Sequence, residues 1–411
     1  MFMLGPVSAL DCIAFCVFLA IQLPLQVGLF ETLGVLIPCL PFLLLKLPFQ
    51  FLKTRFLVPA HRQPPFVAVA SPFEDFVIRC VRYAFSNIPP KIGRVFFSKA
   101  VALPFLRFRL LRHGFLKTPL HWREYGDGER KRFKGIWIIQ DPTKRPDCCI
   151  FYAHGGGFMM GSSYFYLEFL LTWLSLLSES GYKNPAIFSL EYTLVPDACF
   201  PTQLNQSIAA YEHVSSMVGD ASKICVAGDS AGAGIVLTLL FHIARPDAKP
   251  RRVSYVPTYS LQKPGFAVLI SPWVTMVSPL HRNTESDYLE ASHLHGYAKQ
   301  YAGGAQFVHD PLISPGSCRD VDWWSEALPS RGVHLTYGAE EMLAAGIADL
   351  EDFLRRNSFR VTQHAEAGEI HAWPVASLFL CNTIDARKKG LADIVKKIKE
   401  NITSDEANEG K

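Results

Sequence analysis

Apolar and polar positions divide the chain into an uncharged N-terminal stretch, an amphipathic stretch and a long alternating region. From residue 119 onward, short apolar runs rich in β-branched and aromatic residues predict buried strands. These runs cover residues 133–140, 148–153, 186–190, 223–227, 266–270, 333–337 and 360–364. Segments with helical periodicity separate them, at 164–178, 202–217, 231–244, 342–356 and 376–400. Strands that alternate with helices predict an α/β fold, with a mostly parallel sheet covered by helices on both faces.

Residues 63–118 are predicted to form an amphipathic helical cap. Apolar side chains recur there at helical spacing, at Phe73, Phe76, Val77, Cys80, Val81 and Ala84. Arg79 and Arg82 lie between them, and basic residues also interrupt the apolar run 95–111. One interpretation is a lid whose charges are solvated, and the other is a surface that lies against anionic lipid. The aperiodic stretch 278–330 is expected to pass over the functional site.

Residues 1–62 are predicted to form a membrane anchor with a basic flank. The run from Cys12 to Phe30 carries no charge and is long enough to cross a hydrocarbon core of about 30 Å as a helix. Pro24 interrupts it, which a transmembrane helix tolerates. The second apolar run, 33–45, is too short to span alone. We therefore expect a single signal-anchor helix, with a hairpin confined to one leaflet and a cleaved signal peptide as alternatives.

The sequence gives conflicting signals about the side of the membrane. Four basic residues follow the apolar stretch, at Lys46, Lys53, Arg55 and Arg62, whereas Asp11 precedes it. The positive-inside rule would then leave the body in the cytosol. Sequons at Asn205 and Asn401 would permit glycosylation in a lumenal body, but such triplets are common by chance.

The length of 411 residues fits one catalytic domain, 119–411, with an N-terminal appendage better than two full domains. The net charge of +4 is too small to indicate nucleic-acid binding as the main role. The ten cysteines form no CxxC pair and no disulfide framework. His281, His293 and His295 could suggest a metal, but no cysteine or carboxylate pattern supports one, and we expect no cofactor.

A G-x-S-x-G motif provides a candidate nucleophile. It reads Gly228-Asp229-Ser230-Ala231-Gly232, between a predicted strand and a predicted helix. This context is the one that a nucleophile elbow requires, because the serine adopts a strained turn and the flanking glycines remove side chains that would clash. The alternative is an ordinary glycine-rich turn between strand and helix.

A glycine cluster upstream provides a candidate oxyanion hole. It reads His154-Gly155-Gly156-Gly157-Phe158 and follows a predicted buried strand. Acyl transfer passes through an oxyanion that needs preorganised N–H donors, and glycines let backbone amides approach it. We expect the amides of Gly156, Gly157 and Ala231 to donate, with His154 bracing the loop. A phosphate-binding loop is not favoured, because no Lys-Ser/Thr pair follows and the G-x-G-x-x-G spacing is absent.

These two motifs resemble the hormone-sensitive-lipase branch of the α/β-hydrolases in order and spacing. The segment 192–197 and the pair Phe200-Pro201 look like a further signature of that family. The resemblance covers roughly residues 120–400. With the N-terminal membrane segment, the chain looks most similar to fungal steryl acetyl hydrolases and to arylacetamide-deacetylase-like esterases of the endoplasmic reticulum. That likeness implies an α/β-hydrolase fold and favours a lumenal catalytic body.

The resemblance also implies a triad in the order serine, acid, histidine. Of the two glutamates after the strand 333–337, Glu341 fits the family register and Glu340 does not. The family often carries Asp there. His371, in a loop after the last strand, is the expected base; His364, which ends an alternating strand, is the rival. The competing interpretation of the glutamates is a solvated helix N-terminus favoured by the macrodipole.

Four aromatic and sulfur-containing residues beside the motifs could line an apolar pocket or simply pack, namely Phe158, Met159, Tyr164 and Trp273. The predicted function is hydrolysis of short-acyl esters of lipophilic alcohols, such as sterols or terpenoids, through an acyl-enzyme. The expected partners are that small substrate and a membrane. A lactonase, amidase or acyl transferase would use the same triad. A catalytically dead binding member, like the gibberellin receptor that resembles this family, is disfavoured by the presence of His371.

Overall fold

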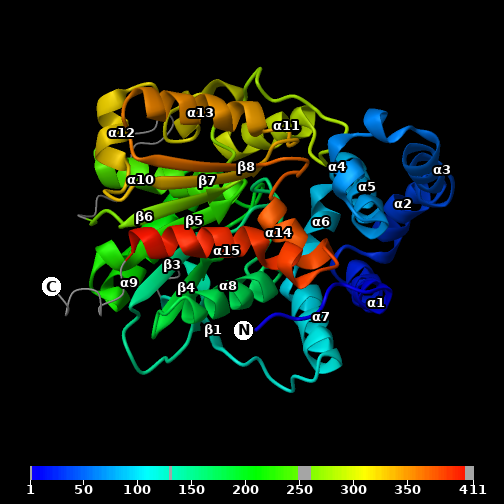
Figure 1. Ribbon diagram of the computed structural model, residues 1–411, viewed down its shortest axis with the longest axis horizontal. Coiled ribbons are helices and arrows are strands. Elements are labelled where there is room, and N and C mark those ends of the chain that lie inside the picture. The colour runs from blue at the N-terminus through cyan, green and yellow to red at the C-terminus, as the bar shows by residue number, and fades with distance from the viewer. Residues whose placement is uncertain (1, 129–131, 249–260, 403–411) are drawn as a thin grey trace.

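The computed structural model describes residues 2–128, 132–248 and 261–402, and a sheet of eight strands lies at its centre (Figure 1). The strand order is β1-β2-β4-β3-β5-β6-β7-β8. Strand β2 is antiparallel to both of its neighbours, and every other adjacent pair is parallel. The strands are β1 (His121–Gly126), β2 (Lys134–Ile139), β3 (Cys148–Ala153), β4 (Pro185–Leu190), β5 (Ile224–Asp229), β6 (Phe266–Ile270), β7 (Val333–Gly338) and β8 (Val361–Glu366).

Helices cover both faces of the sheet, as the alternating pattern predicted. They are α8 (Leu167–Glu179), α9 (Thr202–Val218), α10 (Ala231–Ala244), α11 (Ala291–Ala302), α12 (Val321–Ala327), α13 (Ala344–Arg356), α14 (Trp373–Leu380) and α15 (Ile384–Asn401). Successive side chains of β3 enter opposite cores, since Phe151 packs with one buried cluster and Ile150 and Tyr152 with the other. This two-sided burial explains why the strands are continuous apolar runs.

The α/β fold with a mostly parallel sheet is confirmed, with two local differences. The predicted helix 376–400 is two helices, because α14 ends before Cys381 and Thr383 caps α15 by accepting from the amide of Ala386. The aperiodic stretch 278–330 contains α11 and α12. Leu294 and Tyr297 of α11 reach the cavity that contains Ser230, so part of this stretch does pass over the site.

The N-terminal apolar segment forms two long helices. Helix α1 (Ala9–Gln26) is followed by α2 (Leu29–Pro41), which continues through α3 (Leu47–Leu52) as one helical stretch, Leu29–Leu57. The expectation that the second apolar run is too short to span a membrane was wrong, because the helix extends well beyond 33–45. Both helices are long and apolar enough to cross a membrane by length and composition. Only 11% and 17% of their most apolar windows are buried.

Four helices follow between the apolar segment and the sheet, namely α4 (Pro65–Val69), α5 (Pro72–Asn87), α6 (Pro90–Phe97) and α7 (Lys99–Arg112). A capping box between Ser71 and Glu74 begins α5. Helix α7 is more than a surface lid, because Leu106 and Leu110 belong to the same buried cluster as α8 and α15. Phe2 and Leu4, which precede α1, are buried in that cluster as well.

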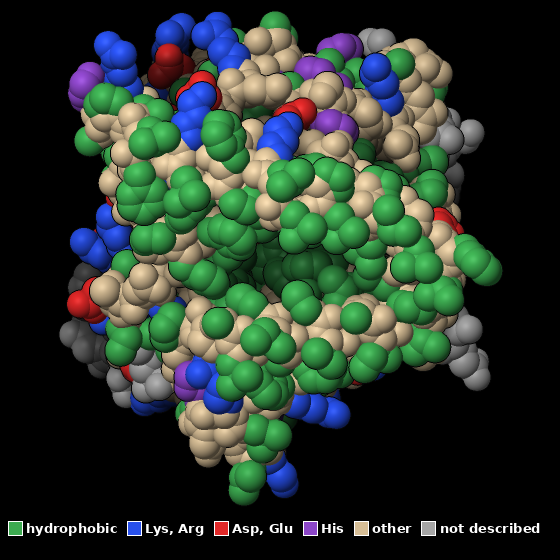
Figure 2. Space-filling view, turned by 90° about the vertical axis from the view of Figure 1, so that its right-hand side faces the viewer, with side chains coloured by type: hydrophobic (Ala, Val, Ile, Leu, Met, Phe, Trp, Pro, Cys, Tyr) green, Lys and Arg blue, Asp and Glu red, His purple; other side chains and the backbone are tan. Residues whose placement is uncertain are grey.

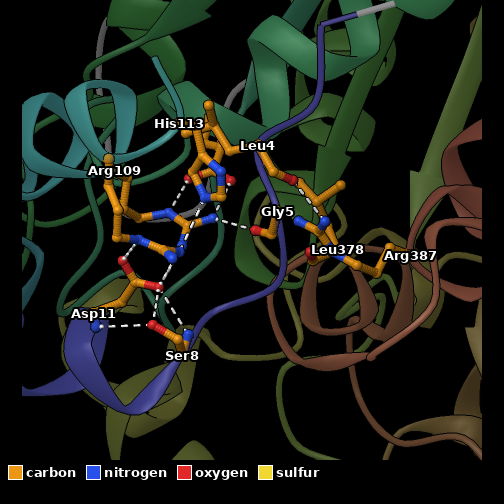
Figure 3. A network of polar contacts seen from close by, with 10 residues as sticks. Leu4, Gly5, Ser8, Asp11, Arg109, His113, Leu378 and Arg387 are labelled. Atoms are coloured by element: carbon orange, nitrogen blue, oxygen red, sulfur yellow. Dashed lines mark hydrogen bonds and ion pairs between the residues drawn. The ribbon is translucent and has the colours of Figure 1, made fainter. Parts of the chain in front are cut away.

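A buried ionic network attaches the start of α1 to the catalytic domain (Figure 3). Arg109 is fully buried; it forms a bidentate contact with Glu168 at 2.8 Å and lies 3.1 Å from Asp11. It also donates to the carbonyl oxygen of Gly5 at 2.7 Å. Asp11 is bound in addition by Arg112 at 2.6 Å. Buried charges of this kind are tolerated only when each is paired and hydrogen-bonded.

We expect Arg109→Met to lower the free energy of unfolding by about 3–5 kcal/mol, because it leaves two buried carboxylates without their shared partner. Arg107→Met, on the exposed side of the same helix, is the matched control and should change stability by less than about 0.5 kcal/mol. Chemical denaturation of the two variants in the same detergent measures both effects. Equal losses would contradict a structural role for the network.

Candidate active site

Ser230 lies in a strained turn between β5 and α10. Its φ of 51° is in the left-handed region, which non-glycine residues rarely adopt. The flanking glycines are sterically required: a Cβ on Gly228 would lie 2.7 Å from the carbonyl carbon of Gly232, and a Cβ on Gly232 would lie 2.1 Å from the carbonyl oxygen of Ala153. The turn therefore holds the serine at the carboxyl end of the sheet, with 6% of its surface exposed.

His371 and Glu341 come from the loops after β8 and β7, and the structure brings them together. Nδ1 of His371 lies 3.5 Å from Oε1 of Glu341, within ion-pair range but longer than a well-formed hydrogen bond. Such contacts commonly tighten only when substrate is bound. Both side chains are almost fully buried, and His371 lines the same cavity as Ser230. With Nδ1 turned to Glu341, the other ring nitrogen, Nε2, is the one left for the serine.

The two rival residues are placed elsewhere. Glu340 is half-buried, and its backbone carbonyl accepts a hydrogen bond from the Thr284 hydroxyl at 2.7 Å. His364 lies on β8 and contacts Asp393 at 3.2 Å and Glu366 at 2.8 Å. The two carboxylates that contact His364 lie outside the cavity of Ser230, and neither Glu340 nor His364 lines that cavity.

The glycine loop after β3 lies across the same cavity. Gly155, Gly156 and Gly157 all line it. Gly156 and Gly157 have φ values of 115° and 63°, and a Cβ on Gly156 would lie 2.1 Å from the carbonyl oxygen of Met160. Within the described part of the chain, the amides of Gly156 and Gly157 donate to no protein acceptor. Ala231 is the first residue of α10, a position whose amide has no partner within the helix. These three amides can therefore hold an oxyanion.

Asp229 fixes the glycine loop against the nucleophile turn. Its carboxylate accepts from the hydroxyl of Tyr152 at 2.6 Å, from the amide of Gly155 at 2.8 Å and from the hydroxyl of Tyr166 at 2.7 Å. Burial raises its pKa, and the three donors oppose that shift. His154, at the start of the loop, is fully buried, and its Nδ1 lies 2.8 Å from the carbonyl oxygen of Gly155. Burial lowers its pKa to about 4, so the ring stays neutral at neutral pH.

Two polar residues that the sequence analysis missed connect the loops of the acid and the base. The Ser271 hydroxyl donates to Oε2 of Glu341 at 2.5 Å and accepts from the amide of Ala372 at 2.9 Å. Asp287 accepts from the amides of Met342 at 2.8 Å and His371 at 3.1 Å. Neither residue lies in a motif, although Ser271 directly follows a predicted strand end, where functional side chains gather in parallel sheets.

The charges around His371 favour its protonated form. Burial lowers the pKa of His371, but the carboxylates of Glu341, Asp287 and Asp229 outweigh burial, and the net pKa lies above the ordinary value of a histidine. Burial raises the pKa of Asp287. The histidine is thus surrounded by groups that would stabilise an imidazolium, the state that a general base reaches after taking a proton.

The cavity has a volume of about 530 Å³ and mostly apolar walls. Its aromatic lining includes Phe15, Phe76, Phe85, Phe96, Phe97, Phe105, Phe165, Phe379 and Tyr164. Of the four predicted pocket residues only Tyr164 lines it. Phe158 is buried in the core, where its ring stacks on that of Tyr301 with the two centroids 3.7 Å apart, and Trp273 packs beside it. Met159 is also core, so these three predictions are corrected.

The described residues contain no group of three or more His, Cys, Asp or Glu side chains that could hold a metal ion. His281 and His295 are in contact, with Nδ1 and Nε2 3.0 Å apart, and burial lowers the pKa of His281 to about 4. His293 lies instead beside Glu290, at 3.6 Å. The three histidines therefore do not converge on one site.

Comparisons with known proteins agree with this arrangement. A family model described as alpha/beta hydrolase fold matches residues 150–375, more than half of the chain. An acetyl-hydrolase of Streptomyces hygroscopicus is 27% identical over 238 residues, which cover 56% of this chain and 70% of that protein. Steryl acetyl hydrolase 1 of Saccharomyces cerevisiae is 24% identical over 222 residues, 50% of this chain and only 47% of that protein.

A crystal structure of an esterase from the bacterial hormone-sensitive lipase family superposes with a TM-score of 0.61 at 21% sequence identity. The match covers 81% of this chain and 99% of that chain. At this identity the likeness shows the fold, and the chemistry has to be argued from the residues above.

We expect Glu341→Gln to reduce kcat by at least about 100-fold, and Glu340→Gln to change it less than about threefold. A neutral amide at Glu341 no longer orients and stabilises the histidine, whereas Glu340 does not face the cavity. Steady-state kinetics on one soluble ester measure both variants. The reverse ranking would show that the acid lies one residue earlier.

The raised pKa of His371 predicts the position of the acid limb of the pH–rate profile. The base must be neutral, so kcat/KM should fall as the pH falls through a pKa above the ordinary histidine value of about 6.5. Asp287→Asn removes a charge that raises this pKa, and we expect the acid limb to move to lower pH. Asp352→Asn, which removes the same charge from an exposed site on α13, should leave the limb in place. An unshifted limb in Asp287→Asn would exclude this electrostatic role.

Proposed function

The chain belongs to the α/β-hydrolase fold family, in its hormone-sensitive-lipase-like branch, and we propose that it is a serine esterase with Ser230 as its nucleophile. The observation that carries the proposal is the strained turn of Ser230, which opens into one cavity with His371 and the glycine loop. His371 is the proposed base and Glu341 the proposed acid, since Nδ1 of the histidine faces that carboxylate.

The reaction proceeds in two halves. Nε2 of His371 takes the Ser230 proton while Oγ bonds to the carbonyl carbon of the ester, and the oxyanion is held by the amides of Gly156, Gly157 and Ala231. Collapse of this intermediate breaks the ester bond, and the leaving alcohol takes the proton from His371. Water then attacks the acyl-enzyme in the same way and releases the acid. Glu341, held by Ser271, orients the imidazolium throughout.

The proposed substrates are short-acyl esters of lipophilic alcohols, such as sterols or terpenoids. The aromatic walls of the cavity suit a large apolar alcohol, and its volume of about 530 Å³ lies in the usual range for small-molecule sites. Similarity to proteins named acetyl-hydrolase and steryl acetyl hydrolase supports a short acyl group.

We further propose that the protein is attached to the membrane of the endoplasmic reticulum, with its catalytic domain in the lumen. The two apolar N-terminal helices support attachment. The lumenal side is supported by the resemblance to esterases of that compartment, against the basic residues that follow the apolar segment. Protection of a C-terminal epitope from protease in sealed microsomes is expected; cleavage of the epitope would place the domain in the cytosol.

We expect Ser230→Ala to reduce ester hydrolysis by roughly 10³-fold or more without loss of folding, because it removes the proposed nucleophile from a turn. A fluorophosphonate should label the parent protein on Ser230 and leave the variant unlabelled, as read by peptide mass spectrometry. Ser216→Ala, an exposed serine on α9, is the control and should behave like the parent. Esters of one sterol with increasing acyl length should react progressively more slowly.

A further inference from the structure

Both ends of the apolar N-terminal segment are held on the catalytic domain. Before α1, the amide of Phe2 donates to the hydroxyl of Ser175 at 2.6 Å, and Arg387 donates to the carbonyl of Leu4 at 2.6 Å. Arg109 then binds the Gly5 carbonyl and Asp11 (Figure 3). These contacts hold the chain that enters α1 on the same body that contains Ser230.

The chain returns to the same body after Leu57. Phe66 of α4 is buried, and its amide donates to the hydroxyl of Ser286 at 3.3 Å. Arg82 of α5 donates to the carbonyl of Glu285 at 2.6 Å. A single membrane-spanning helix would place residues 2–8 and the catalytic domain on opposite sides of a bilayer. The contacts at both ends are incompatible with that arrangement.

Between these attachments, residues 9–57 form a layer that we call the apolar platform. Of the 25 large hydrophobic side chains that are exposed in the described residues, 18 lie between Leu10 and Leu57. On α1 they recur at helical spacing, at Leu10, Ile13, Val17, Ile21 and Leu25. The platform contains two acidic residues, Asp11 and Glu31. Glu31 forms an ion pair with Lys91 at 2.7 Å. Such a concentration of exposed apolar surface marks an interaction site.

The opposite side of the platform forms a wall of the active-site cavity. Cys12, Phe15 and Cys16 of α1 line the cavity that contains Ser230 and His371. One helix thus presents one side to the cavity and the other to the surroundings. Figure 2 shows the outer face, where hydrophobic side chains surround a hollow.

Basic side chains of the platform and of the residues that follow it form a margin along one edge. Five basic side chains line a cleft of about 590 Å³, against two acidic ones, Glu285 and Glu290; the basic residues are Lys46, Lys53, Arg62, Arg79 and Arg82. Figure 2 shows Lys, Arg and His side chains gathered along the upper edge of the apolar face. An apolar face with a cationic edge is the pattern of a protein that lies in one leaflet beside anionic headgroups. A second copy of the chain would not require the cations at this edge.

We propose that the apolar platform lies in a single leaflet of a lipid bilayer and that the active-site cavity receives its ester laterally from that leaflet. The proposal rests on the proposed esterase function, and it names the substrate as an ester dissolved in the membrane. It replaces the spanning signal-anchor with a surface that enters and leaves the same side.

The topology is tested with epitopes at both ends of the full-length protein in sealed microsomes. A platform confined to one leaflet puts the N-terminal and C-terminal epitopes on the same side, so protease either reaches both or reaches neither. Epitopes on opposite sides would establish a single spanning helix and overturn the proposal. A two-pass hairpin also puts both ends on one side, so a third epitope is inserted at the turn 27–28 between α1 and α2. Exposure of that epitope on the opposite side would establish the hairpin and likewise overturn the proposal. This result does not depend on esterase activity.

The route of the substrate is tested with the triple variant Val17→Asn, Ile21→Asn, Leu25→Gln, whose side chains face outward and do not line the cavity. Hydrolysis of cholesteryl acetate in phosphatidylcholine vesicles should fall by roughly tenfold or more, because apolar area that inserts into lipid is lost. Hydrolysis of soluble p-nitrophenyl acetate should stay within about twofold. The matched control, Met217→Asn, Val321→Asn, Ile384→Asn, removes exposed apolar residues from α9, α12 and α15 and should alter neither rate.

The outcomes distinguish a failure of lateral substrate entry from a failure of the proposed esterase function. The parent rate on vesicles should follow the mole fraction of ester in the membrane at constant bulk ester; a rate set by bulk concentration overturns lateral entry. An unchanged ratio of vesicle to soluble rates in the platform variant also overturns it. If that unchanged ratio comes with a change of molecular mass in light scattering, a second copy covers the face. Absence of soluble esterase activity in the parent protein instead refutes the proposed function.

Discussion

The buried carboxylate of Asp229 is the interaction on which the site depends. A carboxylate removed from water costs several kcal/mol unless donors replace its hydration, and here Tyr152, Gly155 and Tyr166 do so. These donors come from β3, the glycine loop and the residue that precedes α8. One charge therefore positions the amides for the oxyanion relative to Ser230, the residue next to it. The cost of burying Asp229 is offset only when the glycine loop and the turn of Ser230 are both in place.

The same chain of contacts reaches the N-terminal helices. Tyr166, which binds Asp229, directly precedes α8, and two residues further on Glu168 binds Arg109. Arg109 in turn holds Asp11 at the start of α1. Because α1 also contributes a wall of the cavity, helices outside the hydrolase sheet complete the site. One short polar path through α7 and α8 thus connects Asp11, at the start of the apolar platform, with Asp229, the neighbour of Ser230.

The sheet and the strained turn at Ser230 could be predicted from the sequence, because both leave strong local signals. A strand buried on two faces must be apolar throughout, and a turn as tight as that of Ser230 must carry Gly228 and Gly232. Ser271 and Asp287 leave no such signal, since the sequence pattern of an aperiodic stretch does not distinguish a buried polar residue from an exposed loop residue. Their roles follow from tertiary contacts with Glu341 and with the loop of His371.

Two expectations of the sequence analysis rested on local pattern alone. Phe158 was a pocket candidate, with core packing as the alternative, because it is next to the glycine loop; its ring stacks on that of Tyr301 in the core. The expectation of a single spanning helix, with a one-leaflet hairpin as an alternative, came from the uncharged N-terminal run. A hydropathy pattern measures how apolar a segment is; it carries no information on where a side chain points or where the ends of the segment are held. Those ends are fixed by Arg387 and Arg109, residues distant in sequence, through contacts with Leu4 and Asp11. In the proposed single-leaflet arrangement, an apolar helix fixed in this way turns one side to lipid and the other to the substrate cavity.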